Sequence, residues 1–339
     1  MKHNFHLAKY FLLSKLKNLP FKLNFSITDK CNSNCITCNI WKYKDYKNEL
    51  KLWEIRNIFR KFSPALCWLT LTGGEPFLRN DFISIIDTAC EELPNLRLIS
   101  IPSNGMDQKK IISDVKKVMD LKINIYITFS LDGPPEVHDE IRGVSNSFKK
   151  TWGTYIKVKE LTKNNKHIKV GLETTISDKN IDSLPPFIKK IKNHESIISI
   201  AHNSHVYKNE NDKILFSHQN IKKIRNIIEM AGKQYSFFSF ESAIKKIYLK
   251  NIPDWLGKKS KIMPCTALNN SVYIDSCGKV APCPMWGFVV GDLRTHNYDI
   301  MNLWDSKRAH IARKLINMGK CCSCWTPCEA YQSIVYNWV

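Results

Sequence analysis

Six apolar, strand-like runs alternate with helical segments along most of the chain. The runs cover residues 21–27, 66–71, 96–101, 123–131, 168–176 and 197–201. The segments between and after them carry apolar residues at helical spacing, in sets such as Leu52, Ile55, Phe59 and Phe62, then Ile111, Val115 and Val118, then Ile221, Ile224 and Ile228. Strands separated by helices pair in parallel, so the pattern predicts an α/β fold, a partial (β/α)6 TIM-like barrel. In such a barrel the chemistry belongs at the carboxyl ends of the strands.

Three cysteines follow the first predicted strand. Cys31, Cys35 and Cys38 are spaced by three and then two residues. A four-iron, four-sulfur cube normally takes four cysteine thiolates, so a site with three leaves one iron open to bind a further molecule. Structural zinc, the alternative, usually takes paired Cys-x2-Cys hairpins that close all four positions. The triplet therefore favours an iron–sulfur cluster with an open iron.

Glycine or polar residues end the next three predicted strands. The first ends in residues 72–76, Thr-Gly-Gly-Glu-Pro, where glycines let the backbone approach a ligand closely and the glutamate can accept from an ammonium. The next two strands end in residues 102–105 and 130–134. Arg142 follows soon after, and its guanidinium presents a fork of donors that fits a carboxylate.

These motifs, in this order, resemble those of the radical S-adenosylmethionine (SAM) enzymes. The resemblance implies that Cys31, Cys35 and Cys38 bind a [4Fe-4S] cluster, that its open iron chelates SAM, and that an external flavodoxin- or ferredoxin-like protein reduces it. The implied SAM-binding residues are Gly73, Gly74, Glu75 and Pro76 at its amino group, Ser103 and Asn104 near its ribose, and Ser130 and Arg142 at its carboxylate, with Asp132 between these last two. The family commonly has an aromatic residue at position 37, whereas this chain has Thr37, which leaves Trp41 or another ring to pack against the adenine.

Seven of the twelve cysteines lie in the last quarter of the chain. Pro253, Gly257 and the following lysines predict a boundary, which gives an N-terminal segment at 1–20, a barrel at 21–250 and a small cysteine-rich extension at 262–339. The extension resembles the SPASM and twitch domains of radical SAM enzymes, which bind auxiliary clusters. We expect one auxiliary [4Fe-4S] cluster, held by Cys265, Cys283 and two of Cys321, Cys322, Cys324 and Cys328, with Cys321, Cys324 and Cys328 preferred. A structural zinc knot is the alternative, and Cys277 stands at a turn position.

The formal net charge of +20 comes mostly from dispersed lysines. No arginine-rich stripe or aromatic ladder accompanies them, which argues against nucleic acid as a partner. With no signal peptide before the cysteines, a reducing cytoplasm is expected. Residues 1–20 are apolar and basic, so they form either a helix that closes the bottom of the barrel or a peripheral contact with an anionic membrane.

Other polar residues near strand ends are candidates for the barrel interior. Glu173 and Thr174 lie near the end of the fifth predicted strand, and residues 202–205 follow the sixth. A histidine there is more often an ordinary hydrogen-bonded residue than a substrate ligand. The isolated Cys67 and Cys90 are expected in the core, where free cysteines usually lie.

The resemblance implies a radical enzyme that cleaves SAM and abstracts hydrogen from its substrate. A peptide is the favoured substrate, and a small molecule, sugar or lipid is the alternative. Only thirty residues precede Cys31, so a peptide leader would need a separate binding protein. A non-enzymatic zinc or nucleic-acid-binding protein is the third hypothesis, but it gives residues 72–76 and 130–142 no role.

Overall fold

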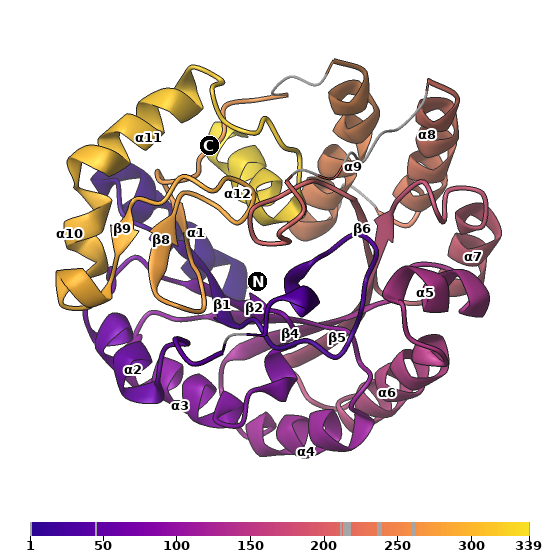
Figure 1. Ribbon diagram of the computed structural model, residues 1–339, viewed down its shortest axis with the longest axis horizontal. Coiled ribbons are helices and arrows are strands. Elements are labelled where there is room, and N and C mark those ends of the chain that lie inside the picture. Colours follow the sequence, from indigo (N-terminus) through magenta and orange to yellow (C-terminus); the bar gives the residue numbers. More distant parts are fainter. Residues whose placement is uncertain are drawn as a thin grey trace.

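A computed structural model describes residues 2–44, 46–210, 212, 218–235, 239–258 and 262–338. Six parallel strands lie side by side in chain order and curve into an open barrel, as expected (Figure 1). They are β1 (Lys22–Thr28), β2 (Trp68–Gly73), β3 (Leu98–Ser103), β4 (Asn124–Ser130), β5 (Ile168–Ile176) and β6 (Ser196–Ile200).

Helices cover the outer face of this sheet (Figure 1). They are α2 (Leu52–Arg60), α3 (Phe82–Glu92), α4 (Gln108–Val118), α5 (Pro135–Arg142), α6 (Ser147–Leu161), α7 (Leu184–Ile191) and α8 (His218–Gly232). Alternate residues of a strand point to opposite faces. In β1, Leu23, Phe25 and Ile27 belong to the hydrophobic core, whereas the residues between them are polar and face the barrel interior.

The cysteine-rich extension continues the same sheet. Strand β7 (Ser271–Ile274) pairs in parallel with β1, and β8 (Lys279–Ala281) and β9 (Gly291–Asp292) add antiparallel strands. Gly278 has φ +90° in the turn between β7 and β8, a conformation that favours glycine. Helices α10 (Ile300–Trp304), α11 (Lys307–Asn317) and α12 (Pro327–Trp338) follow. Both cysteine-rich regions therefore belong to one nine-stranded sheet.

The N-terminal segment forms helix α1 (Lys2–Lys17) at the bottom of the barrel. Phe11 packs edge-on against Phe21 with ring centroids 5.4 Å apart, and the fully buried Cys67 completes this cluster. The expected bottom-closing helix and the core position of Cys67 are confirmed, and Cys90 is partly buried against the main core. Among the described residues, none of the helices combines the length and apolar character that crossing a membrane requires.

Helix α9 (Phe240–Lys258) runs through Pro253 and Gly257, where the sequence suggested a break. The buried side chains of Leu249, Ile252 and Leu256 hold this turn against the core, and their burial outweighs the local cost of proline in a helix.

Helix α12 lies inside the ring of helices, beside β1, where the barrel is open (Figure 1). Lys22 Nζ donates to the carbonyl of Cys328 at 2.8 Å, and Asn24 Nδ2 donates to Glu329 Oε1 at 3.3 Å. Burial lowers the pKa of Lys22 and raises the pKa of Glu329 to about 7. The polar inner face of β1 is thus hydrogen-bonded by the last helix.

Candidate functional site

The cysteine loop, residues 31–38, is held between the end of β2 and the end of α5. On one side, Gly74 N donates to the carbonyl of Thr28 at 2.7 Å, just before the loop. On the other side, Asn34 N donates to the carbonyl of Arg142 at 2.9 Å, at the end of α5. The loop is therefore held by backbone hydrogen bonds with Gly74 and Arg142, two residues that the sequence predicted to bind SAM.

Three glycines allow this close approach. A Cβ on Gly73 would lie 2.1 Å from the carbonyl oxygen of Thr28, and one on Gly74 would lie 2.1 Å from that of Lys30. A Cβ on Gly143, whose φ is +62°, would lie 2.5 Å from the carbonyl oxygen of Asn34. The sequence suggested that the first two glycines admit a ligand, and the structure shows that they admit the backbone that leads into the cysteine loop.

The three thiols of the loop are surrounded by hydrogen-bond donors. Ser33 N donates to Cys31 Sγ at 3.5 Å, and Arg142 Nη1 donates to Cys35 Sγ at 3.7 Å. Burial raises the pKa of Cys31 to about 11 and that of Cys38 to about 12. A coordinated metal deprotonates such thiols outright, and the donors stabilise the thiolates. The residues present therefore fit a thiolate-ligated cluster.

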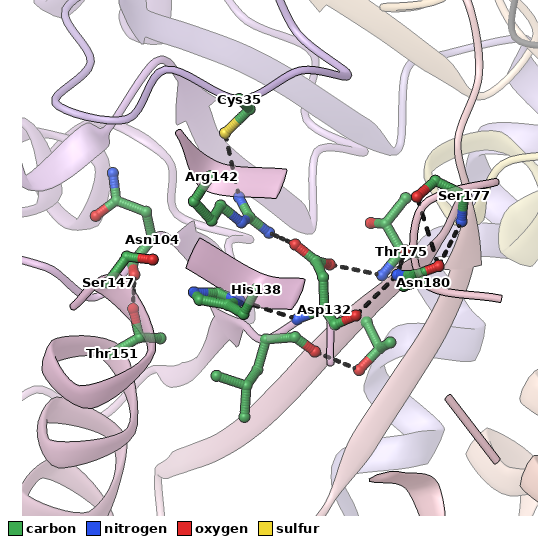
Figure 2. Close-up of polar contacts among 12 residues, drawn as sticks. Cys35, Asn104, Asp132, His138, Arg142, Ser147, Thr151, Thr175, Ser177 and Asn180 are labelled. Carbon is green, nitrogen blue, oxygen red and sulfur yellow. Dashed lines mark hydrogen bonds and ion pairs between the residues drawn. The ribbon is translucent and has the colours of Figure 1, made fainter. Parts of the chain in front are cut away.

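Arg142 is held beside the loop by Asp132 (Figure 2). Arg142 Nη2 lies 2.6 Å from Asp132 Oδ2, and Asp132 Oδ1 accepts from Thr175 N at 3.0 Å. The buried backbone N–H of Asp132 donates to His138 Nδ1 at 3.1 Å. Although burial opposes the charge of Arg142, Asp132 and Cys35 raise the pKa of its guanidinium.

The Nε of Arg142 is buried and has no partner among the described residues. A buried N–H without an acceptor is costly, and a ligand carboxylate would satisfy it. This orphaned donor fits the SAM carboxylate expected here. Asp132 contacts Arg142 and Thr175 through its two carboxylate oxygens, so it positions Arg142, and the SAM contact expected of Asp132 itself stays a prediction.

Glu75 joins the ends of β2 and β3. Its Oε1 accepts from the Ser103 hydroxyl at 2.9 Å, and its Oε2 accepts from Asn104 N at 2.6 Å. Burial raises the pKa of Glu75 to about 7. Asn104 Nδ2 in turn donates to Asn32 Oδ1 at 2.7 Å and lies 4.0 Å from Cys31 Sγ. Three predicted SAM residues are therefore brought together at the cysteine loop.

Pro76 opens the short 3-10 helix η2 (Pro76–Leu78) and is buried beside Glu75. Ser130 ends β4, directly opposite Glu173 of β5 in the sheet register. Trp41, in the 3-10 helix η1 (Ile40–Lys42), donates from Nε1 to the carbonyl of Cys35 at 3.3 Å. Its half-buried ring therefore lies beside the loop, where an adenine-packing ring is expected.

The other candidate residues of the interior divide into two groups. Glu173 lies near the interior, 3.4 Å from the Thr128 hydroxyl, and burial raises its pKa. Thr174 is fully buried and donates to the carbonyl of Leu131 at 2.7 Å, a structural role.

The histidines after β6 also have structural contacts. His202 is buried, stacks on Trp255 with ring centroids 4.5 Å apart and accepts from Trp325 N at 3.3 Å. His205 pairs with Glu210 at 2.7 Å. Both therefore follow the ordinary hydrogen-bonded behaviour that the sequence favoured.

Five cysteines of the extension line one pocket together with apolar side chains such as Met263, Trp286 and Ile316. They are Cys265, Cys283, Cys321, Cys322 and Cys324. Hydrogen bonds from the thiols of Cys283, Cys321 and Cys324 lower the pKa of Cys322. This sulfur-rich pocket fits an auxiliary iron–sulfur cluster and includes Cys322, which the preferred ligand set left out.

Cys277 and Cys328 lie outside the lining of that pocket. Cys277 lies in the β7–β8 turn, and the thiol of Cys328 contacts the Thr326 hydroxyl at 3.1 Å. Within the described ranges, no three His, Cys, Asp or Glu side chains converge on a point where they could hold a single metal ion, whereas each cysteine of a four-iron cube binds a different iron. Which thiols bind the auxiliary cluster, Cys328 included, stays a prediction.

Two family models match this chain. The radical SAM superfamily model matches residues 25–191, and the SPASM iron–sulfur cluster-binding model matches residues 265–325. The chain belongs to the radical SAM superfamily. It is an enzyme, and its cofactors are SAM and [4Fe-4S] clusters.

Curated relatives of this radical SAM chain include two different activities. A GTP 3′,8-cyclase of Haemophilus influenzae is 33% identical over 138 residues, 40% of each chain. The sporulation killing factor maturation protein SkfB of Bacillus subtilis is 27% identical over 182 residues, 53% of this chain and 42% of SkfB. These alignments span less than half the length of either relative.

Solved radical SAM structures match over more of the chain. The enzyme anSMEcpe with bound AdoMet and a Cp18Cys peptide superposes with a TM-score of 0.61 and 16% identity, covering 94% of this chain and 95% of that one. Streptococcus suis SuiB bound to its precursor peptide SuiA superposes with a TM-score of 0.58 and 17% identity, covering 94% and 74%. At these identities the likeness shows the fold.

Proposed function

We propose that this radical SAM enzyme modifies a peptide by abstracting a hydrogen atom from one of its residues. The observation that carries SAM cleavage is the buried Arg142, which touches Cys35 and keeps one donor unpaired. The peptide assignment is supported by SkfB, a maturation protein, and by the peptide-bound structures of anSMEcpe and SuiB.

When bound and reduced by the external donor, the cluster and SAM would supply the radical chemistry that removes the hydrogen atom. The protein's own residues orient and shield this chemistry. Arg142, held by Asp132, binds the SAM carboxylate through its free Nε, and Glu75 fixes Ser103 and Asn104 beside the cysteine loop. Gly73 and Gly74 keep that loop pressed against the end of β2.

A small molecule is the second candidate substrate. It is favoured by the GTP 3′,8-cyclases, one of which has the higher identity of the two relatives described above. We expect a flavodoxin- or ferredoxin-like donor in either case, and for a peptide substrate a separate leader-binding protein. A reducing cytoplasm suits the cluster thiols of Cys31, Cys35 and Cys38.

The test uses anaerobically purified and reconstituted enzyme with SAM and dithionite. Synthetic peptides encoded by the short open reading frames flanking the gene are added one at a time, and GTP is added in parallel. We expect one peptide to stimulate 5′-deoxyadenosine formation and to change in mass. Stimulation by GTP and by none of the peptides would replace the peptide proposal with the nucleotide one.

A further inference from the structure

Helix α1 presents two faces with different surroundings. On its inner face, Phe11 packs against Phe21, and Ser14 is fully buried. The Tyr10 hydroxyl of the same face donates to Asn95 Oδ1 at 2.5 Å. Phe21 directly precedes β1, and Asn95 lies shortly before β3. The inner face therefore covers the amino ends of the strands, whereas the cysteine loop follows the carboxyl end of β1.

The outer face of α1 carries two exposed leucines. Leu12 is 47% exposed and Leu16 is 75% exposed. Lys9, which is exposed as well, lies three positions before Leu12, and Leu16 lies four positions after it. Helical residues three and four apart are neighbours on one face, so these side chains form one stripe. A single exposed leucine would need no explanation, but this pair shares its face with a cation.

The end of α12 packs against α1 at the same end of the barrel. Lys15 Nζ donates to the carbonyl of Tyr336 at 3.2 Å and lies 4.9 Å from the centre of its ring. The ring of Tyr336 also meets Phe11 edge-on, with centroids 6.0 Å apart. Trp338, two residues further along α12, is 56% exposed. The first and last helices therefore bring exposed leucine and tryptophan side chains to one end of the barrel.

Positive charge accompanies this apolar stripe. Helix α1 contains four lysines and neither aspartate nor glutamate. Lys9 and Lys17 are exposed, and Arg97 lies beside the helix, with its guanidinium 5.6 Å from the centre of the Tyr10 ring. Lysines attract anionic lipid headgroups, leucine enters the headgroup boundary, and tryptophan favours the interface itself. The outer face of α1 is therefore complementary to an anionic bilayer surface.

A lipid surface fits this face better than a second protein does. A stable interface between proteins takes about 20–30 residues from each side. The exposed apolar side chains here are few, namely Leu12, Leu16 and Trp338. A bilayer accepts such a small set, because each apolar side chain enters it independently and each lysine can reach any nearby headgroup.

We propose that α1 docks the enzyme on an anionic lipid surface. Leu12, Leu16 and Trp338 enter the headgroup boundary, and Lys9 and Lys17 contact lipid phosphates. The contact is peripheral and turns the amino ends of the strands toward the lipid. The cysteine loop follows the carboxyl end of β1, so the SAM site stays accessible to its substrate and its electron donor. This inference does not depend on the peptide function.

The test uses the full-length, reconstituted enzyme and sedimentation with lipid vesicles. One set of vesicles is phosphatidylcholine alone, and the other contains about 30% phosphatidylglycerol, which supplies the negative charge. We expect binding to the anionic set only, and this binding should weaken when the salt concentration rises from about 0.1 to about 0.5 M. Leu12→Gln/Leu16→Gln should bind the anionic vesicles about tenfold more weakly, because the variant can no longer bury two leucines.

The matched control is Ile311→Gln/Met318→Gln. These two side chains are 42% and 54% exposed on the basic helix α11 and at its end, so the change removes exposed apolar surface elsewhere. The control should bind anionic vesicles as the wild-type enzyme does. Both variants should form 5′-deoxyadenosine from SAM in solution at the wild-type rate, which shows that each is folded.

Equal binding to neutral and anionic vesicles, or no binding to either, would overturn the proposal. An equal loss of affinity in the two variants would overturn it as well, because α1 would then have no special part. If the wild-type enzyme bound no vesicles and formed a dimer that Leu12→Gln/Leu16→Gln dissociated, the face would be an interface between two copies. The flanking-peptide assay tests the peptide function separately, so none of these outcomes would affect it.

Discussion

The close contact at Gly74 predicts that a single added methyl group disables the enzyme. A Cβ at this position would lie 2.1 Å from the carbonyl oxygen of Lys30, and real Cβ atoms essentially never come within 3.0 Å of another heavy atom. The obstacle is backbone, so it cannot rotate away. Gly74→Ala therefore displaces the chain directly before Cys31 by about 1 Å.

The size of the effect follows from that displacement. A misplacement of about 1 Å in a positioned reaction can cost about 100-fold in rate. Overpacking of this kind costs about 1–3 kcal/mol of stability, which leaves most of the protein folded. We expect Gly74→Ala to fold, to bind its radical SAM cluster poorly, and to cleave SAM at about one hundredth of the wild-type rate.

The matched control is Gly153→Ala in helix α6. A Cβ there would lie 3.3 Å from Gln108 Nε2, the movable end of a side chain. Both proteins are reconstituted in parallel, and iron content, melting temperature and dithionite-driven 5′-deoxyadenosine formation are measured. If Gly74→Ala kept a full cluster and cleaved SAM within threefold of Gly153→Ala, the inference that these glycines shape the cysteine loop would be refuted.

Three further predictions concern the buried charges and thiols. Asp132→Asn leaves Arg142 buried without its ion pair, so the free energy of unfolding should fall by about 3–5 kcal/mol and SAM binding should weaken. An unchanged free energy of unfolding in urea would show that the ion pair does not stabilise the protein. Burial lowers the pKa of His138 to about 4, below its unfolded value of about 6.5, so stability should fall by about 2 kcal/mol between pH 6.5 and pH 5. His138→Asn should not show this fall in stability. If urea titrations gave the two proteins the same change in the free energy of unfolding between pH 6.5 and pH 5, the prediction would be wrong. Cys283→Ala should lose about four irons while Cys277→Ala keeps them all, as measured by iron and sulfide analysis; equal losses would show that Cys277 is a ligand.

The strands could be predicted from the sequence because each is a short apolar run that ends in glycine or polar residues. The fifth strand has the expected ends, and the observed ends of the other five differ from the expected ones by one or two residues. Helix α7 carries Pro185 and Pro186 in its first turn, where proline is tolerated, so these prolines do not break it. Helix α9 continues past the expected boundary because its side chains are buried against residues distant in the sequence. The local composition around Pro253 and Gly257 gives no sign of that burial.

The cysteine loop and its neighbouring strand ends were also predictable, because each motif is contiguous in the sequence. The roles of Asp132 and Glu75 were not, since each depends on a partner brought close only by folding.

Strand β1 has ladder partners on both sides, β2 of the barrel and β7 of the extension. The two iron–sulfur regions are therefore mounted on one rigid frame, and the distance between them is fixed by backbone hydrogen bonds. Electron exchange between the clusters would then be insensitive to substrate binding. A change in substrate range would come from altered loops at the rim, such as residues 201–210, because the frame itself cannot widen without breaking β1 away from a neighbour.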